Sequence, residues 1–397
     1  MKKMALKTKA ESRKKVSVAS GMDTDFWFVF ASVALLVIGL VMVGSSSISI
    51  ADRQLGQPFY YLIRQVIYVG LGLLLAYAVL HIPVEFWKRS GGSLLLLGIV
   101  SLFLLMIPGV GKEVNGSARW ISIGVANIQP SEFIKFFVVI YLAGYLVRRG
   151  EEVRTAFKGF VKPMLILALI CALLLAEPDF GAAAVMMVTA MGMMFLGGVK
   201  FWQFCMLTAS VGALLALLAI SSPYRLERIT AFMDPWADPF ASGFQLTQAL
   251  IAFGRGEWLG AGLGSSVQKL FYLPEAHTDF LFAVLAEELG LVGSLFVLGL
   301  FVLLIVRAFK IGRRAEYAGR QFDSFVAYGC GMWVGLQAVI NIGVNMGLLP
   351  TKGLTLPLMS YGGSSILVMC IVVALLLRID YETRNPDINF SSGRVRW

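Results

Sequence analysis

Charged residues are scarce in this 397-residue sequence, where they make up 15% of the residues against 58% for hydrophobic ones. An average soluble domain carries roughly 25% charged residues. The mean hydropathy of +0.77 therefore excludes an ordinary water-soluble domain. The apolar runs are long and unbroken, which excludes a membrane β-barrel built from alternating segments of about ten residues. The sequence predicts an all-α, polytopic integral membrane protein.

The sequence also lacks the residue patterns of several common sites. Its four cysteines lie singly in apolar runs, without the paired spacing of a disulfide or a metal site, so we interpret them as packing residues. No Walker pattern and no metal-ligand spacing occurs. The net charge of +10 does not indicate a nucleic-acid partner, because the basic residues gather at the ends of the apolar runs.

Ten apolar runs remain as candidate membrane spans, each needing about 20 residues to cross. We expect a basic tail over residues 1–24, a membrane domain over 25–378 and a second tail over 379–397. The predicted spans are 25–47, 60–81, 93–108, 131–147, 163–177, 181–198, 201–220, 280–306, 324–348 and 355–378.

The basic residues also predict the orientation of these spans. An even number of spans places both termini on one side, and most of the 34 Lys and Arg residues then fall in the segments on that side. This excess is typical of cytoplasmic segments. Both termini are therefore expected in the cytoplasm, and the long connecting segment 221–279 on the outer face.

The outer segment 221–279 is longer than a connection between packed helices requires, which indicates a function of its own. Residues 245–253 have helical apolar spacing and are expected at the membrane interface. Cations on the outer face suit an anionic partner such as a lipid phosphate or pyrophosphate; the alternative is that they are solvated loop charges. These cations are Lys112, Arg119, Arg225, Arg228, Arg255, Lys269 and Lys352.

Asp279 lies where this polar segment meets the apolar run that begins at Phe280. Partial removal of water there would raise the pKa of the carboxyl group and make the carboxylate a better proton acceptor. Alternatively, Asp279 caps the following helix, with Thr278 assisting. On that helix Glu287 would lie roughly 12 Å deeper, near enough to share a polar channel. Spacing alone leaves both interpretations of Asp279 open.

Polar side chains also occur inside the predicted spans, where lipid penalises them. Glu132 and Lys135 are spaced to share a helix face and form a pair, which is either structural or a substrate contact. A stripe of carboxamides every four residues must bond to another helix or line a cavity. Clustered Gly and Ser near residue 362 permit a broken helix. The stripe consists of Gln337, Asn341 and Asn345.

Four motifs in order resemble the SEDS family of bacterial cell-wall polymerases. They are VNGSARWI at 114–121, QPSEFIK at 129–135, PEAHTDFLFAVLAEELGLVG at 274–293 and NIGVNMGLLPTKGLTLPLMSYGGSS at 341–365. Within that family, TKGLTLP followed by YGGSS is more similar to the cell-division branch than to the elongation branch. The resemblance covers nearly every span and the outer loops.

The resemblance implies a peptidoglycan glycosyltransferase that polymerises lipid II, a disaccharide-peptide on undecaprenyl pyrophosphate, at the outer face of the bacterial cytoplasmic membrane. The family's essential loop aspartate falls on Asp279, which would act as general base while undecaprenyl pyrophosphate leaves with inversion. Cations would stabilise the leaving group, and the other matched residues would contact substrate or shape its site. The implied substrate-binding residues are Arg119, Glu132, Lys135, Lys269, His277 and Lys352.

The resemblance also implies partners and leaves two other functions to weigh. Its partners would be undecaprenyl-pyrophosphate-linked glycan, a class B penicillin-binding protein transpeptidase, other division-site proteins and membrane lipid. No cofactor is certain, although a divalent cation such as Mg²⁺ or Mn²⁺ could assist the pyrophosphate. By composition alone the chain could instead be a flippase for lipid-linked sugars or a non-catalytic division scaffold.

Overall fold

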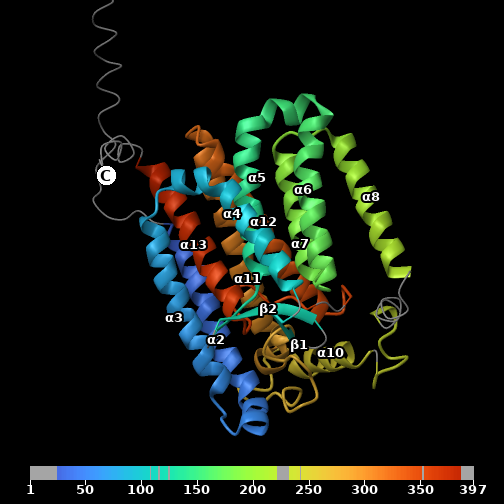
Figure 1. Cartoon of the computed structure of the whole chain (residues 1–397). Helices are drawn as coiled ribbons and strands as arrows, with labels where there is room; N and C mark the ends of the chain where they lie inside the picture. The colour runs from blue at the N-terminus through green and yellow to red at the C-terminus, as the bar shows by residue number, and fades with distance from the viewer. Residues whose placement is uncertain are drawn as a thin grey trace, which may run out of the picture.

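The computed structural model describes residues 25–107, 109–114, 117–123, 126–220, 232–241, 243–350 and 353–385. Long helices dominate it and run roughly alongside one another (Figure 1). The helices are α2 (Phe26–Leu55), α3 (Tyr60–His81), α4 (Val84–Leu105), α5 (Pro130–Thr155), α6 (Phe157–Ala176), α7 (Phe180–Leu196), α8 (Phe201–Ile220), α10 (Phe244–Gly256), α11 (Leu281–Tyr317), α12 (Gln321–Asn345) and α13 (Gly363–Arg384).

Every predicted span overlaps one of these helices, which confirms a polytopic helical membrane fold. Within the described ranges, eight helices are long and apolar enough to cross a membrane, and α7 is apolar but shorter. The count of ten and the side of the termini stay predictions. The eight helices are α2, α3, α4, α5, α6, α11, α12 and α13.

The predicted first residues of two spans differ most from the starts of their helices, for different reasons. The third was expected at 93–108, but α4 begins at Val84 because the charged side chains of its first turns remain exposed and do not interrupt the helix. The last was expected from residue 355, but α13 begins at Gly363. The apolar residues just before it, among them Leu356 and Leu358, are buried without being helical.

A small antiparallel sheet, which the sequence analysis did not predict, connects α4 to α5. Its strands are β1 (Gly111–Val114), β2 (Ser117–Ile123) and β3 (Ala126–Ile128), in the order β1-β2-β3. Ile121 is paired with Gly111 on one side and Ile128 on the other, and the β1–β2 register shifts between Lys112 and Glu113. In Figure 1 the sheet crosses the lower end of the helices.

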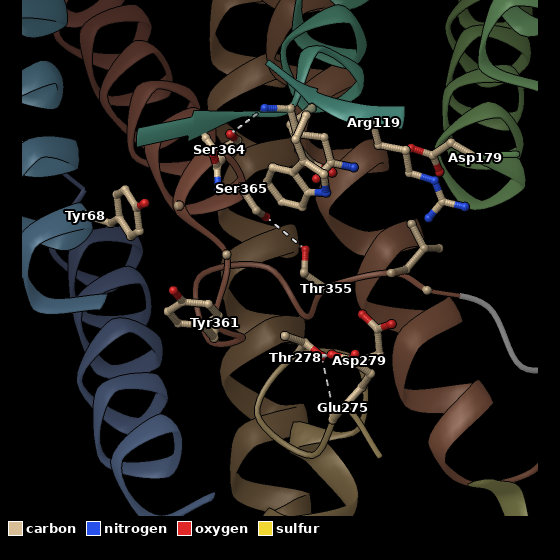
Figure 2. Close-up of a pocket in the computed structure, with 18 of the residues that line it drawn as sticks. Tyr68, Arg119, Asp179, Glu275, Thr278, Asp279, Thr355, Tyr361, Ser364 and Ser365 are labelled. Carbon is tan, nitrogen blue, oxygen red and sulfur yellow. Dashed lines mark hydrogen bonds between the residues drawn. The ribbon is translucent and has the colours of Figure 1, made fainter. Parts of the chain in front are cut away.

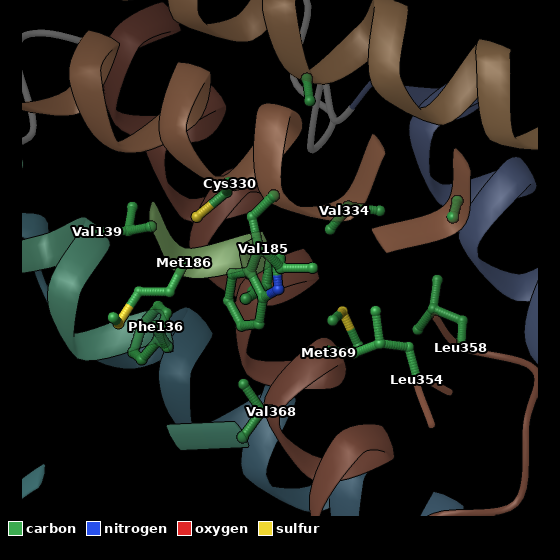
Figure 3. Packing of buried hydrophobic residues seen from close by; sticks show 14 of the residues in the cluster. Phe136, Val139, Val185, Met186, Cys330, Val334, Leu354, Leu358, Val368 and Met369 are labelled. Atoms are coloured by element: carbon green, nitrogen blue, oxygen red, sulfur yellow. The ribbon is translucent and has the colours of Figure 1, made fainter. Parts of the chain in front are cut away.

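The core lies where α5, α7, α12 and α13 meet. Figure 3 shows apolar side chains from all four helices gathered at this point. Four of these side chains, one from each helix, are at most 2% exposed: Phe136 from α5, Val185 from α7, Cys330 from α12 and Met369 from α13. The four cysteines are free; Cys330 and Cys370 are buried, as expected of packing residues, whereas Cys171 and Cys205 are partly exposed. By contrast, α8 contacts little besides α7 and stands to the side of the bundle (Figure 1).

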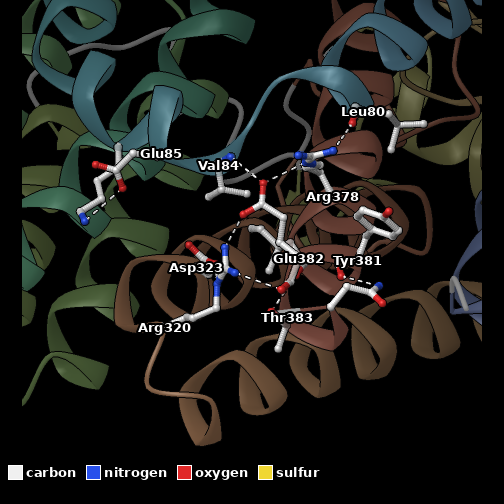
Figure 4. A network of polar contacts seen from close by, with 12 residues as sticks. Leu80, Val84, Glu85, Arg320, Asp323, Arg378, Tyr381, Glu382 and Thr383 are labelled. Carbon is white, nitrogen blue, oxygen red and sulfur yellow. Dashed lines mark hydrogen bonds and ion pairs between the residues drawn. The ribbon is translucent and has the colours of Figure 1, made fainter. Parts of the chain in front are cut away.

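The end of the bundle opposite the sheet is held together by buried ion pairs. Glu382 on α13 accepts hydrogen bonds from Arg378, from Arg320 at the start of α12 and, at 3.0 Å, from the backbone N–H of Val84 (Figure 4). Arg314 near the end of α11 bonds to both Asp25 and Asp380. The first and last described residues thus lie at the same end of the bundle, as an even number of crossings requires.

Glu382→Gln should destabilise the protein by about 2–3 kcal/mol, because it removes the buried carboxylate that Arg378, Arg320 and the Val84 N–H share. Arg320 keeps Asp323 as a partner, whereas Arg378 loses its only carboxylate among the described residues. Thermal unfolding in detergent measures the effect. Glu85→Gln is the matched control, since Glu85 bonds to Lys88 and Arg89 on an exposed surface and its loss should cost about 0–1 kcal/mol. Equal shifts in the two variants would contradict this account of the network.

Candidate active site

A cavity of about 350 Å³ lies below the sheet and is walled by segments far apart in the sequence (Figure 2). Non-helical backbone before α11 and before α13 forms much of its wall. Its lining residues are Arg64, Tyr68, Arg119, Trp120, Asn127, Gln129, Glu132, Asp179, Glu275, Thr278, Asp279, Gly353, Leu354, Thr355, Tyr361, Gly362, Gly363, Ser364 and Ser365.

The carboxamide stripe of α12 holds these non-helical segments in place. The side-chain amides of Asn341 and Asn345 both donate to the backbone carbonyl of Asp279, at 2.8 and 2.9 Å. Asn341 also donates to the carbonyl of Leu354, and Gln337 donates to that of Thr355. The stripe therefore bonds mainly to non-helical cavity backbone, whereas the sequence suggested a second helix or a cavity surface.

The carboxyl group of Asp279 points into the space beside Gly353. A methyl group on Gly353 would come within 3.1 Å of Asp279 Oδ2, so glycine leaves room next to the carboxylate. The structure also excludes the capping interpretation: Phe280 is the N-cap residue of α11, and no side chain caps that helix. Asp279 is thus positioned by its backbone, and its side chain lines the cavity.

The surroundings of Asp279 raise the pKa of its carboxyl group to about 7. The largest cause is burial, which disfavours the charged form. Repulsion from Glu275 raises the pKa further, Arg119 lowers it, and Asp179 adds a smaller increase. A carboxylate with a pKa near neutrality accepts a proton far more readily than an ordinary aspartate while remaining substantially ionised.

Glu275 lies in the same wall as Asp279. Its backbone adopts φ of 55°, which a residue with a side chain adopts at a cost. Its side chain accepts a hydrogen bond from the Thr278 hydroxyl at 2.7 Å, and its carbonyl accepts one from the N–H of Phe280 at 3.2 Å. These bonds close a tight loop that keeps two carboxylates, Glu275 and Asp279, on one cavity.

Arg119 projects from β2 into the cavity, as its predicted role requires, but its guanidinium already has partners. It donates to the carbonyls of Glu177 and Pro178 at 3.0 and 2.9 Å, in the turn between α6 and α7. Asp179 in the same turn lines the cavity and caps α7 through the N–H of Ala182. Arg119 therefore connects β2 to the turn between α6 and α7.

The predicted Glu132–Lys135 pair is confirmed. The two side chains meet at 2.7 Å on α5, and Lys135 also donates to Gln337 at 3.0 Å. Lys135 is buried and does not line the cavity, whereas Glu132 does. Among the residues that the structure describes, the second carboxylate oxygen of Glu132 has no hydrogen-bond partner. It is thus the member of the pair that could contact a substrate.

His277 lies behind the cavity wall. Its ring is 4.5 Å from that of Tyr61 on α3 and 5.5 Å from that of Tyr361, and its carbonyl accepts a hydrogen bond from the Tyr361 N–H at 3.0 Å. Burial lowers the pKa of its imidazole. Through these tilted ring contacts His277 joins the Asp279 loop to α3, which favours the loop-orienting role over substrate contact.

Lys269 is buried away from the cavity. Its ammonium group lies 2.7 Å from Glu288 and 2.9 Å from the Ser45 hydroxyl of α2. Glu287, which the spacing placed near enough to share a polar channel with Asp279, is fully buried and accepts hydrogen bonds from the backbone N–H groups of Val267 and Gln268. The geometry gives Lys269 a structural role.

Some predicted residues lie outside the described part of the chain, and some lining residues were not predicted. Lys352, Arg225 and Arg228 belong to the first group. Arg64 and Asp179 belong to the second; each is a charged residue at a helix end or on a span, which is the signal that could have found it. The described residues hold no group of three or more His, Cys, Asp or Glu side chains suited to a metal ion, so we derive no step through one.

Asn345→Leu should loosen the Asp279 segment, because Asn345 is fully buried and bonds to both the Asp279 carbonyl and the Ala283 N–H. We expect a loss of about 1–3 kcal/mol of stability and faster amide hydrogen exchange in residues 279–284. Gln54→Leu, at an exposed position, is the control. Unchanged exchange in the Asn345 variant would show that the stripe does not hold this segment.

Comparisons with known proteins agree over most of the chain. A family model described as "Cell cycle protein", named for FtsW, RodA and SpoVE, matches residues 26–385. A "Probable peptidoglycan glycosyltransferase FtsW" from Nitrosococcus halophilus is 61% identical over 92% of this chain and 94% of its own length. Another from Coxiella burnetii is 55% identical over 91% and 97%.

Solved structures are similar as well. One, described as "Structural coordination of polymerization and crosslinking by a peptidoglycan synthase complex", has a TM-score of 0.75 at 30% identity, over 91% of this chain and 99% of that chain. The rod shape determining protein RodA of Thermus thermophilus has a TM-score of 0.67 at 28% identity, over 91% and 97%. The chain is a multi-pass membrane protein that belongs to the FtsW, RodA and SpoVE family.

Proposed function

We propose that this chain is a peptidoglycan glycosyltransferase that polymerises lipid II during cell division, with Asp279 as general base. The observation that carries the proposal is a half-buried carboxylate with a pKa near 7 in a cavity between membrane helices. The names of the curated relatives support the reaction class.

The proposed reaction is the transfer of a glycosyl group from a lipid-linked donor to an acceptor sugar. The 4-hydroxyl of the acceptor sugar loses its proton to Asp279 as its oxygen attacks the anomeric carbon of the donor, and the bond to undecaprenyl pyrophosphate breaks with inversion. The leaving group departs as a stable anion, so the reaction requires no proton donor of the kind a glycosidase uses. Positive charge and N–H groups near that anion lower the barrier instead.

The proposal extends to the setting of the enzyme. We place it in the cytoplasmic membrane at the division septum, with the cavity open to the outer leaflet. A class B penicillin-binding protein is its proposed partner, because the glycan strands it makes require cross-linking. A solved relative described as part of a peptidoglycan synthase complex supports this pairing.

Asp279→Asn should lower lipid II polymerisation at least about a hundredfold, because the amide cannot accept the hydroxyl proton. The assay follows glycan chains formed by the purified protein with its transpeptidase partner. Asp234→Asn, which changes an exposed carboxylate of the outer segment, is the control and should retain full activity. Equal polymerisation by the Asp279 variant would remove the mechanism, and lipid transfer across vesicles without polymer would point to a flippase.

The pH profile tests the electrostatic tuning of Asp279. Activity should rise as pH increases through about 7, where the carboxyl group loses its proton. Glu275→Gln removes a repulsive negative charge, so the pKa of Asp279 falls. The rising limb of the pH–activity profile then moves to lower pH. The control is Glu257→Gln, at an exposed site in the outer segment. A limb that stays in place, or moves to higher pH, would contradict the role of Glu275.

A further inference from the structure

The cavity has two ends of different character, and Arg64 of α3 stands at one of them. Figure 2 shows Tyr68 and Tyr361 on one side of the cavity and Arg119 and Asp179 on the other. Arg64 belongs to the Tyr361 side, because its guanidinium is near enough to Tyr361 to oppose the rise in the pKa of that hydroxyl and lies 4.7 Å from the centre of the Tyr60 ring.

Neither cation forms an ion pair among the described residues, and the two differ in how far their N–H donors are already occupied. Arg119 donates to two backbone carbonyls, and its charge acts on Asp279. Arg64 makes no ion pair with any carboxylate in the part of the chain that the structure describes. Its positive charge is therefore available to a ligand in the cavity.

Backbone donors lie at the same end as Arg64. The first helical residues of α13, Gly363 to Ser365, line the cavity, and no side chain caps this helix. The N–H groups of a first helical turn have no acceptor within the helix, and the helix dipole adds partial positive charge there. Gly363 permits this placement, because a methyl group on it would come within 2.7 Å of the Tyr68 ring.

The geometry of an inverting displacement decides what occupies each end. The attacking oxygen and the leaving oxygen lie on opposite faces of the anomeric carbon. The base must touch the attacking hydroxyl, so the leaving diphosphate lies on the side away from Asp279. An anionic diphosphate next to Asp279, Glu275 and Asp179 would also be repelled. Both constraints direct the leaving group to the other end of the cavity.

We propose that Arg64, together with the first turn of α13, binds the diphosphate of the polyprenyl-linked donor and stabilises it as it leaves. This inference rests on the proposed function and adds a residue to it. As the acceptor oxygen bonds to the anomeric carbon, Asp279 takes the hydroxyl proton. The electron pair of the breaking carbon–oxygen bond passes to the diphosphate oxygen, where the new negative charge meets Arg64.

The position of Arg64 also suits a ligand that carries a long lipid chain. The neighbouring side chains Ile63, Val66 and Ile67 are 57%, 52% and 53% exposed, as expected of a surface that faces lipid. In the most apolar stretch of α3, only 22% of the residues are buried inside the protein. A polyprenyl chain can thus lie along α3 with its diphosphate at Arg64. At the other end, Arg119 hydrogen bonds to the turn between α6 and α7.

The test measures binding without turnover. Calorimetric titration of the full-length protein in detergent with geranylgeranyl diphosphate should show about tenfold to a hundredfold weaker binding for Arg64→Ala, and an intermediate loss for Arg64→Lys. Asp279→Asn should bind as tightly as wild type. The matched control is Arg53→Ala, which removes an arginine that stacks on Phe271, 4.5 Å from the ring centre, outside the cavity.

Each outcome decides the proposal. Wild-type affinity in a folded Arg64→Ala variant overturns it, and weak binding by Arg119→Ala instead would place the diphosphate at the other end. Geranylgeranyl monophosphate and inorganic pyrophosphate separate the contributions: tight binding of pyrophosphate alone would overturn the role of the lipid-facing side of α3. If wild type polymerises lipid II and Asp279→Asn does not, a negative result for Arg64 leaves the proposed function standing.

Discussion

The hydrogen bonds from the carboxamides of α12 to non-helical backbone are the interactions on which this site depends. Backbone groups within a membrane protein must find partners inside the protein, because lipid provides none. A cavity that exposes Asp279 next to Gly353 needs two irregular segments side by side, and both would leave carbonyls unpaired. Asn341 and Asn345 satisfy the Asp279 carbonyl, and Asn341 and Gln337 satisfy those of Leu354 and Thr355.

The outer segment is attached by the same principle, with glutamates in place of carboxamides. Glu287 and Glu288, buried in α11, accept hydrogen bonds from backbone N–H groups of residues 266–268. Gly290 interrupts α11 at φ of 68°, and Gly260 approaches it so closely that a side chain on either would meet backbone. The path from the outer loop to Asp279 is therefore fixed at both ends, which allows a loop residue to keep a defined position.

The sequence predicted what hydropathy and spacing encode, and missed what depends on contacts distant in the chain. Every predicted span overlaps a helix because lipid demands long apolar runs. The Glu132–Lys135 pair followed from helical spacing. The partners of Asn341, in contrast, lie 13 and 62 residues away, so only the need for partners was predictable. Lys269 looked available to a ligand because nothing local reveals Glu288 behind it.

Burial disfavours the ionised form of Asp279, and its position on the cavity limits that effect. A carboxylate sealed among helices would be held neutral, and one in bulk water would be too weak a base. A wall of backbone on one side, with the mouth of the cavity on the other, gives an intermediate environment and a pKa of about 7. The same opening must admit a sugar and a diphosphate. Figure 2 shows Asp279 and Asp179 on the side of the cavity away from Tyr361. This separation from Arg64 would let the proposed base remain basic while positive charge is present where the leaving group forms.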